Sequence, residues 1–133
     1  MIVSGTYSLG GETICRECAD GRYQPSAGAG SCSVCPAGFS CLDKTANPAP
    51  CSAGTFSLAA QDSCSACSFG QYSAAQAGSC SACPAGYSCA VDGTPTLCPE
   101  GFESALGEGS CNACDNGLYS KSDRTACLSC EPG

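Results

Sequence analysis

The chain has 133 residues, with 12 acidic against 5 basic side chains and no histidine, which gives a net charge of −7. Its apolar residues include 19 alanines and 16 cysteines, whereas Leu, Ile, Val and Phe together number only 16. This acidic composition argues against nucleic-acid and anionic-membrane partners, which need basic patches, and no apolar run is long enough to span or insert into a bilayer. Cross-links through cysteine must therefore replace an ordinary hydrophobic core.

Short strands are the only regular elements that the sequence predicts, because Gly, Ser and Pro interrupt every window long enough for a helix. The best candidates are two- to four-residue strands within GTYSL (5–9), GTFSL (54–58), GQYSA (70–74) and GLYSK (117–121). Each would pair with a segment just before the next cysteine. We expect short hairpins closed by a disulfide at the base, with almost no helix.

The cysteine pattern repeats along the chain at an offset of 47 to 49 residues. One complete unit, from Cys51 to Cys89, has the spacing C-x12-C-x2-C-x12-C-x2-C-x5-C. We predict three tandem repeats without linkers: residues 1–50, incomplete at the N-terminal side, 51–97, and 98–133, incomplete at the C-terminal side. Because each unit can contact only its neighbours, the predicted fold is a small disulfide-rich rod.

A shorter motif recurs seven times: a cysteine, a glycine three residues later, and then an aromatic residue. The glycine allows a positive φ that turns the backbone after each cysteine. The aromatic residue provides the largest apolar surface near each cysteine, so we expect these rings to form the core. The seven aromatic residues are Tyr23, Phe39, Phe56, Tyr72, Tyr87, Phe102 and Tyr119.

The cysteines could bind a metal or one another. The spacing Cys15-x2-Cys18-x13-Cys32-x2-Cys35 fits a four-cysteine zinc site almost as well as a disulfide module. Zinc would leave four cysteines without a role although they recur in the same register, namely Cys41, Cys51, Cys89 and Cys98. A redox-active C-x2-C pair would need a helix N-terminus, which is not predicted. We therefore favour disulfides and keep a zinc module as an alternative.

The segments CPAGFSC, CPAGYSC, CSAGTFSLAAQDSCSAC and CSFGQYSAAQAGSCSAC resemble the ephrin-receptor-like cysteine-rich repeat of the growth-factor-receptor cysteine-rich superfamily. The C-x2-G-x-[YF] loop is also similar to the first module of TNF-receptor repeats. The resemblance extends over essentially the whole chain. It implies an extracellular or cell-surface disulfide-rich module, because such repeats occur in receptors, protist surface antigens and structural proteins of cilia and matrix.

The resemblance also implies a pairing, since in related modules the two cysteines that flank the C-x12-C loop bond to each other. Carried over residue by residue, the implied disulfides are Cys18–Cys32, Cys35–Cys41, Cys51–Cys64, Cys67–Cys80, Cys83–Cys89, Cys98–Cys111 and Cys114–Cys127. Sequence alone leaves overlapping pairings open. Each of the longer loops would contribute about 3 kcal/mol in the chain-entropy model.

This scheme does not include Cys15 and Cys130, which we expect to be unpaired or bonded to another molecule. Ile2 stands where the partner of Cys15 should be, and Cys130 needs a cysteine six residues further on. Three explanations compete: a segment of a longer array, a head-to-tail filament, or a pairing frame that differs from the family's.

Catalysis has little support in the sequence, since the carboxylates are scattered and no nucleophile motif is present. We expect no enzyme activity and no cofactor; calcium at Glu100, Glu103 and Glu108 is a weak possibility without the spacing of a known calcium loop. We expect a structural building block of a filament, surface coat or mastigoneme-like ciliary hair, with self-association or homologous repeats as partners. The alternative is a ligand-binding receptor ectodomain. The threonines near proline are candidates for O-linked glycans: Thr45, Thr94 and Thr96.

Overall fold

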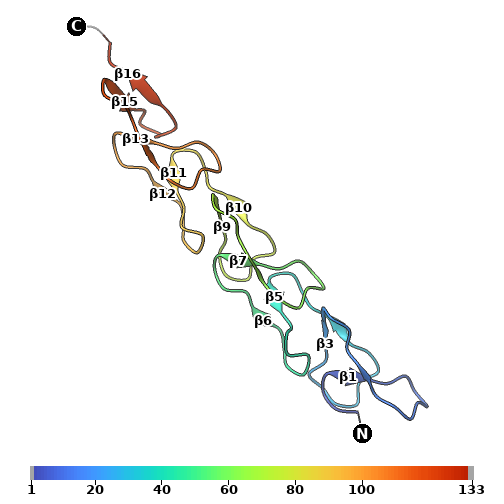
Figure 1. The fold of residues 1–133 in the computed structure, drawn as a ribbon. Helices are drawn as coiled ribbons and strands as arrows, with labels where there is room; N and C mark the ends of the chain where they lie inside the picture. Colours follow the sequence, from blue (N-terminus) through green and yellow to red (C-terminus); the bar gives the residue numbers. More distant parts are fainter. Residues whose placement is uncertain (1, 132–133) are drawn as a thin grey trace.

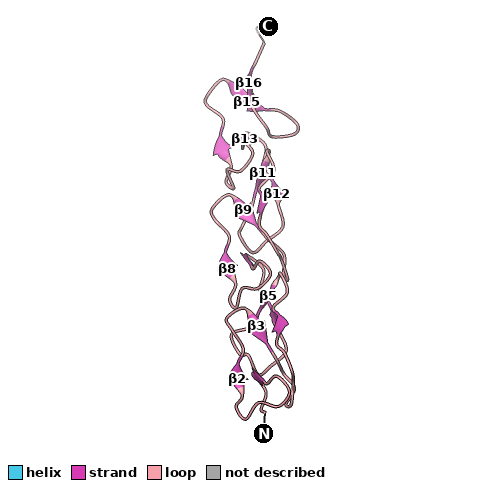
Figure 2. Cartoon of the chain, turned by 90° about the vertical axis from the view of Figure 1, so that its right-hand side faces the viewer, coloured by secondary structure: helices cyan, strands magenta, loops and turns pink. Residues whose placement is uncertain are grey.

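A computed structural model describes residues 2–131 as an elongated rod (Figures 1 and 2). Across these residues there is no helix, and 16 strands of two or three residues form eight antiparallel two-stranded ribbons. The ribbon β1–β2 lies near one end of the rod, and β15–β16 lies near the other (Figure 1). The predicted disulfide-rich rod with short ribbons is confirmed.

Each ribbon is a hairpin between strands that are consecutive in the sequence, and we number the hairpins 1 to 8 in chain order. Hairpins 1 to 4 are β1 (Thr6–Tyr7) with β2 (Arg16–Glu17), β3 (Arg22–Tyr23) with β4 (Ser33–Val34), β5 (Phe39–Ser40) with β6 (Ala49–Pro50), and β7 (Thr55–Phe56) with β8 (Ser65–Ala66). Hairpins 5 to 8 are β9 (Gln71–Tyr72) with β10 (Ser81–Ala82), β11 (Tyr87–Ser88) with β12 (Thr96–Leu97), β13 (Phe102–Glu103) with β14 (Asn112–Ala113), and β15 (Leu118–Ser120) with β16 (Cys127–Ser129).

One backbone hydrogen bond closes every hairpin at its base. The N–H of the cysteine after the second strand donates to the carbonyl of the glycine before the first strand. The bond from Cys18 to Gly5 is 3.0 Å long, and the bond from Cys51 to Gly38 is 2.9 Å long. The same bond recurs from Cys35, Cys67, Cys83, Cys98, Cys114 and Cys130. The cysteine and glycine spacing therefore sets the hairpin length.

The sequence predicted four of these hairpins, those that contain β1, β7, β9 and β15. The other four obey the same cysteine and glycine rule but carry weaker strand signals. Three of them have the aromatic residue directly after the glycine, at Phe39, Tyr87 and Phe102. That shift by one residue moves the ring to the opposite face of the ribbon, because successive side chains of a strand alternate.

The core consists of cysteine, and the expectation of an aromatic core is wrong. Among the residues that the structure describes, all the buried apolar ones are cysteines, and Cys35 and Cys83 have no exposed surface. The repeat-register aromatic residues are half-buried, except Tyr119, which is exposed. A rod one hairpin thick has no interior deep enough to enclose a ring on all sides, whereas the small sulfur atoms fit between two hairpins.

Consecutive hairpins are joined by backbone hydrogen bonds at every junction. In hairpins 1 to 7 an N–H just after the first strand donates to a carbonyl in the loop of the next hairpin. The donors and acceptors are Ser8 and Ala29, Gln24 and Lys44, Cys41 and Asp62, Ser57 and Ala77, Ser73 and Val91, Cys89 and Gly109, and Ser104 and Arg124, at 2.9 to 3.2 Å. Because this contact recurs at all seven junctions, the rod is continuous. The division at residues 51 and 98 stays a prediction.

Candidate functional site

Seven disulfides cross-link the rod, and their pairs are the same as those that the family resemblance implies. Five of them lie in hairpins 2, 4, 5, 7 and 8. Each joins the cysteine three residues before the glycine to the cysteine at the start of the second strand: Cys18–Cys32, Cys51–Cys64, Cys67–Cys80, Cys98–Cys111 and Cys114–Cys127. The remaining two, Cys35–Cys41 and Cys83–Cys89, span only the first strand of hairpins 3 and 6. Those two hairpins are therefore not closed across their base by a disulfide.

The two cysteines of a C-x2-C pair bond in opposite directions along the chain. Cys32 bonds back to Cys18, whereas Cys35 bonds forward to Cys41. A disulfide sulfur has no thiolate to offer to zinc, so a four-cysteine site from Cys15 to Cys35 does not fit this arrangement. In the described part of the chain, no group of three or more His, Cys, Asp or Glu residues could hold a metal.

The cysteines outside the predicted pairs lie toward the two ends of the rod. Cys130 is a free, exposed thiol just after β16. Cys15 is exposed just before β2. Intermolecular bonding of either residue stays a prediction.

Hairpins two apart also contact each other, through the glycine before the first strand. In hairpins 1 to 6 this glycine packs against the loop of the second hairpin along the chain. A Cβ atom placed on Gly5 would lie 2.9 Å from Thr45 Cγ2, and one on Gly54 would lie 3.3 Å from Asp92 Cβ. On Gly21, Gly38, Gly70 and Gly86 it would overlap a loop carbonyl, that of Ala60, Gln76, Gly107 and Asp123 respectively.

These glycines are therefore required for two reasons. Gly38, for example, has a φ of 84°, which side chains with a Cβ adopt at a cost. It also lies so close to the carbonyl of Gln76 that no side chain fits. The sequence predicted the positive φ, but the spacing of residues along the chain does not predict the contact between hairpins two apart. We call each such glycine, together with the space that a side chain on it would occupy, a glycine socket.

The loop that fills a socket is held by a second bond, to a cysteine carbonyl of the hairpin between. The N–H of Ala60 donates to the carbonyl of Cys35 at 2.8 Å, and the N–H of Gln76 donates to that of Cys51 at 2.9 Å. Ala60 and Gln76 both adopt a positive φ, of 65° and 62°. Each loop is thus fixed to both preceding hairpins.

Three buried serines connect neighbouring hairpins through their side chains. Ser57 Oγ donates to the carbonyl of Phe39 at 2.7 Å, Ser73 Oγ to that of Thr55 at 3.0 Å, and Ser104 Oγ to that of Tyr87 at 2.8 Å. Ser57 and Ser104 have no exposed surface. Sequence reasoning missed these residues, because most serines of a Ser-rich chain are exposed to solvent.

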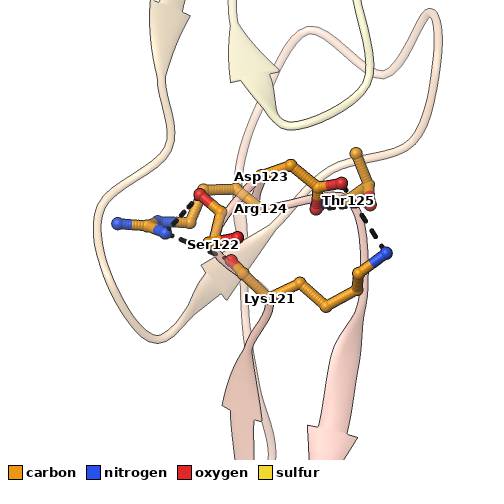
Figure 3. A network of polar contacts seen from close by, with 5 residues as sticks. All are labelled: Lys121, Ser122, Asp123, Arg124 and Thr125. Atoms are coloured by element: carbon orange, nitrogen blue, oxygen red, sulfur yellow. Dashed lines mark hydrogen bonds and ion pairs between the residues drawn. The ribbon is translucent and has the colours of Figure 1, made fainter.

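A short motif, Asp-cation-Thr, occurs twice and builds the same loop. In the first copy both the N–H and Oγ1 of Thr45 donate to Asp43 Oδ1, at 2.9 and 2.5 Å. In the second, the N–H and Oγ1 of Thr125 donate to Asp123 Oδ1, at 3.1 and 2.7 Å (Figure 3). The cation between them is directed to the preceding hairpin.

The cation of each motif donates to a cysteine carbonyl. Lys44 Nζ lies 2.8 Å from the carbonyl oxygen of Cys18 and 2.9 Å from Asp20 Oδ1. Arg124 Nε donates to the carbonyl of Cys98 at 3.1 Å. At these two cysteines the donor to the carbonyl is a side chain, whereas at Cys35 and Cys51 the donor is the backbone N–H of a loop residue. The guanidinium of Arg124 also donates to the carbonyls of its own loop (Figure 3).

The threonine side chains lower the pKa of both motif aspartates. For Asp43 the largest cause is the side-chain hydrogen bond from Thr45, followed by the backbone bond from the same residue. The pKa of Asp123 is lowered in the same order by Thr125, with a further contribution from Lys121. Both carboxylates are charged at neutral pH and act as acceptors that order the loop.

The three candidate glycosylation threonines, Thr45, Thr94 and Thr96, are all exposed. The hydroxyl of Thr45 is engaged by Asp43. Thr94 follows the loop beside Gly54, and Thr96 begins β12. O-linked glycosylation of these residues stays a prediction.

The glutamates considered for calcium are engaged separately. Glu100 Oε1 lies 3.9 Å from Arg124 Nη2, whereas Glu108 accepts bonds from the N–H of Ala105 and from Asn112 Nδ2. Glu103 lies on β13 opposite Asn112. The fold does not bring the three carboxylates together into one site.

Comparison with known proteins supports the cysteine-rich repeat. Residues 5–47, which include hairpins 1 and 2 and the start of hairpin 3, match the family model described as tyrosine-protein kinase ephrin type A/B receptor-like. This match confirms the resemblance over these residues, and the internal repeat extends the same pattern through the later hairpins. No curated protein matches the chain. No helix in the described residues is long and apolar enough to cross a membrane.

Proposed function

We propose that this chain is an extracellular structural building block of a filament, surface coat or mastigoneme-like ciliary hair. Its partners in that assembly are copies of itself or homologous repeats. The observation that carries the proposal is the contact pattern: hairpins 1 to 6 are bonded to the next hairpin and packed on the second one along. A chain joined in this way resists bending at every junction, because no junction consists of a linker alone.

The chemistry of the cross-links supports an extracellular location. Seven disulfides in a chain whose buried apolar residues are cysteines would not persist under cytosolic reducing conditions. Each disulfide closes a loop of 6 to 14 residues of sequence separation. Such short closed loops suit a rod that is exposed to proteases.

A receptor ectodomain is the second candidate function, because the family model matched by residues 5–47 is named after receptor kinases. Ligand-binding surfaces depend on clustered aromatic and arginine anchors. Phe69 and Tyr119, the most exposed aromatic side chains in the described chain, lie in hairpins 5 and 8. They form no common patch, which favours the structural role.

Immuno-electron microscopy of the producing cells tests the proposal. Antibodies raised against the oxidised rod should label an extracellular filament, hair or coat at regular intervals. Labelling of scattered plasma-membrane sites, displaced by a soluble ligand, would favour the receptor. Labelling inside the cell would contradict both.

A further inference from the structure

We infer that the middle of the rod is a side-by-side docking site for a second copy of this chain, in which Phe69 of one copy enters a hollow beside Tyr72 of the next. The inference rests on the proposed role as a building block and specifies one of its contacts. Three observations carry it: an exposed ring that the fold does not need, a hollow with apolar walls, and a stretch of the chain with almost no charge.

Phe69 has the most exposed large apolar side chain in the described part of the chain, at 78%. It directly precedes the glycine of hairpin 5, and the residues at this position in the other seven hairpins are small or polar: Ser4, Asp20, Ala37, Ala53, Ala85, Glu100 and Asn116. A Cβ atom placed on Gly109 would lie 3.8 Å from Phe69 Cε1, and one on Gly78 would lie 3.4 Å from Ala37 Cβ. Alanine thus makes the same contact between hairpins two apart, so the rod does not need a ring here.

A second apolar residue lies on the other side of the same contact. Gly70 packs against Gly107, where the loop of hairpin 7 meets hairpin 5; Phe69 precedes the first glycine and Leu106 precedes the second. The side chain of Leu106 is 71% exposed. In the two other loops with the same bond from a backbone N–H to a side chain three residues on, this position holds a small residue, Gly10 or Ala59. Two apolar residues that the repeat does not require therefore flank one contact.

A hollow of about 280 Å³ lies between hairpins 4, 5 and 6. Tyr72 and three alanines line it, and Asp92 is its one charged lining residue; the alanines are Ala53, Ala74 and Ala75. By contrast, a hollow at hairpins 7 and 8 is lined by both Glu100 and Arg124. Sites for drug-sized ligands are usually larger, about 300–1,000 Å³. The hollow beside Tyr72 therefore suits a single apolar side chain.

The middle of the rod is almost free of charge. Between Lys44 and Glu100 the sequence has only two charged residues, Asp62 and Asp92, and no cation. Two copies that each carry a net charge of −7 repel one another, and contact through this segment brings the fewest like charges together. Interface cores are depleted of charge and enriched in aromatic residues. A second copy, which offers the same uncharged segment, therefore fits this surface better than a charged partner does.

Phe69 and the hollow belong to different rows of hairpins. The socket contacts join the odd-numbered hairpins into one row and the even-numbered hairpins into another. Phe69 lies at the contact of hairpins 5 and 7, whereas the hollow lies beside the contact of Gly54 with Asp92, which joins hairpins 4 and 6. A copy that receives Phe69 in its hollow still presents its own Phe69 to a third copy. The contact is therefore heterologous and gives an open series of rods.

Sedimentation of the oxidised rod tests the inference, with free thiols alkylated so that disulfide-linked dimers do not form. The average mass should rise with concentration without reaching a fixed size, and added salt should strengthen association because it screens the like charges. Phe69→Ala should weaken association about tenfold or more, as for an aromatic anchor. Alanine occupies this position in hairpins 3, 4 and 6, so the fold tolerates it. Leu42→Ala, which removes another exposed apolar side chain, is the control and should change nothing.

A second pair of variants tests the hollow. Ala53→Glu places a carboxylate in it, at a position where hairpin 7 has Glu100, and should abolish association. Ala85→Glu adds the same charge at the equivalent position of hairpin 6 and should leave association intact. Phe69→Ala keeps the hollow and Ala53→Glu keeps the ring. An equimolar mixture of these two variants should therefore form dimers and nothing larger, although each variant alone is monomeric.

A wild-type rod that stays monomeric at the highest concentration it reaches would overturn the inference and leave the hollow to a different partner. Equal effects of Phe69→Ala and Leu42→Ala would also overturn it, and so would a mixture of the two complementary variants that stays monomeric. None of these results changes where antibodies against the rod label the producing cells. Failure of the docking site and failure of the proposed function are therefore distinguishable.

Discussion

Ser57 Oγ donates a 2.7 Å hydrogen bond to the backbone carbonyl of Phe39, 18 residues earlier, and Ser57 has no exposed surface. The bond joins hairpin 4 to hairpin 3 beside the cystine core of the rod. A serine hydroxyl is therefore part of the interior of this rod, which the low aliphatic content of the chain makes possible.

Ser57→Ala should weaken the junction between hairpins 3 and 4. Removing the donor leaves the part-buried Phe39 carbonyl without this bond, a loss of about 1 kcal/mol in the free energy of local opening. Hydrogen exchange of residues 39–41 measures it. Ser65→Ala, on the exposed face of β8, is the control and should change nothing. Equal exchange in both variants would show that the bond is dispensable.

Gly38→Ala should be more harmful than a glycine substitution at an equally left-handed but open site. The strain of a positive φ costs about 1–2 kcal/mol, and overlap with the Gln76 carbonyl adds about 1–3 kcal/mol. Gly107→Ala is the control: its φ is 79°, nothing lies within 4 Å of an added Cβ, and Ala60 occupies the equivalent position of hairpin 4. The yield of correctly oxidised protein and its exchange protection compare the two variants. Similar losses would mean that the socket is not tightly packed.

The sequence predicts the hairpins well because they depend on local spacing. A glycine before the first strand and a cysteine after the second strand fix one hairpin, and the bond from Cys51 to Gly38 has equivalents in the other seven. The expected pairs followed from the family resemblance, since spacing alone left overlapping pairings open. The expectation of an aromatic core was wrong because it considered only the size of the rings. A rod one hairpin thick is too thin to enclose them.

The contacts between hairpins could not be predicted from the sequence. The close approach of Gly21 to Ala60 joins residues that are far apart in the chain, and neither residue type is unusual for a turn. Nothing in the spacing distinguishes Lys44 and Arg124 from solvent-exposed charges, yet each donates to a cysteine carbonyl 26 residues earlier. One signal was available: Asp-Lys-Thr at 43–45 and Asp-Arg-Thr at 123–125 repeat the same order of residue types.

Lys44→Met should loosen the loop of hairpin 3 while keeping the length of the side chain. The variant loses the bond to the Cys18 carbonyl and the ion pair with the largely exposed Asp20, together about 1 kcal/mol. Exchange of residues 42–46 reports the change. Lys121→Met is the matched control, since its ion pair with Asp123 is 3.6 Å long and exposed. If the amides of residues 42–46 exchange equally fast in the two variants, Lys44 does not hold the loop of hairpin 3.

Acidification should release both Asp-cation-Thr loops. The folded pKa of Asp43 and of Asp123 is lowered, chiefly by the threonine hydroxyl. Their contribution to stability is therefore complete above the ordinary pKa of aspartate and is lost as the pH falls through the lowered value. Amide exchange of Thr45 and Thr125, corrected for intrinsic rates, should accelerate in that range. Thr45→Val, which removes the hydroxyl donor, should shift the transition of the first loop to higher pH and leave the second unchanged.

Reduction and chelation should have opposite outcomes for the whole rod. If disulfides hold the cysteine core, a phosphine reductant should convert the extended chain into an unfolded one, because the chain has few aliphatic residues with which to remain folded. A chelator such as EDTA should leave scattering profile and exchange protection unchanged, and the oxidised chain should bind no stoichiometric zinc. Mass spectrometry after alkylation checks that seven disulfides are present before reduction. Retained structure in reductant together with loss of structure in chelator would reverse the assignment and restore the four-cysteine zinc module.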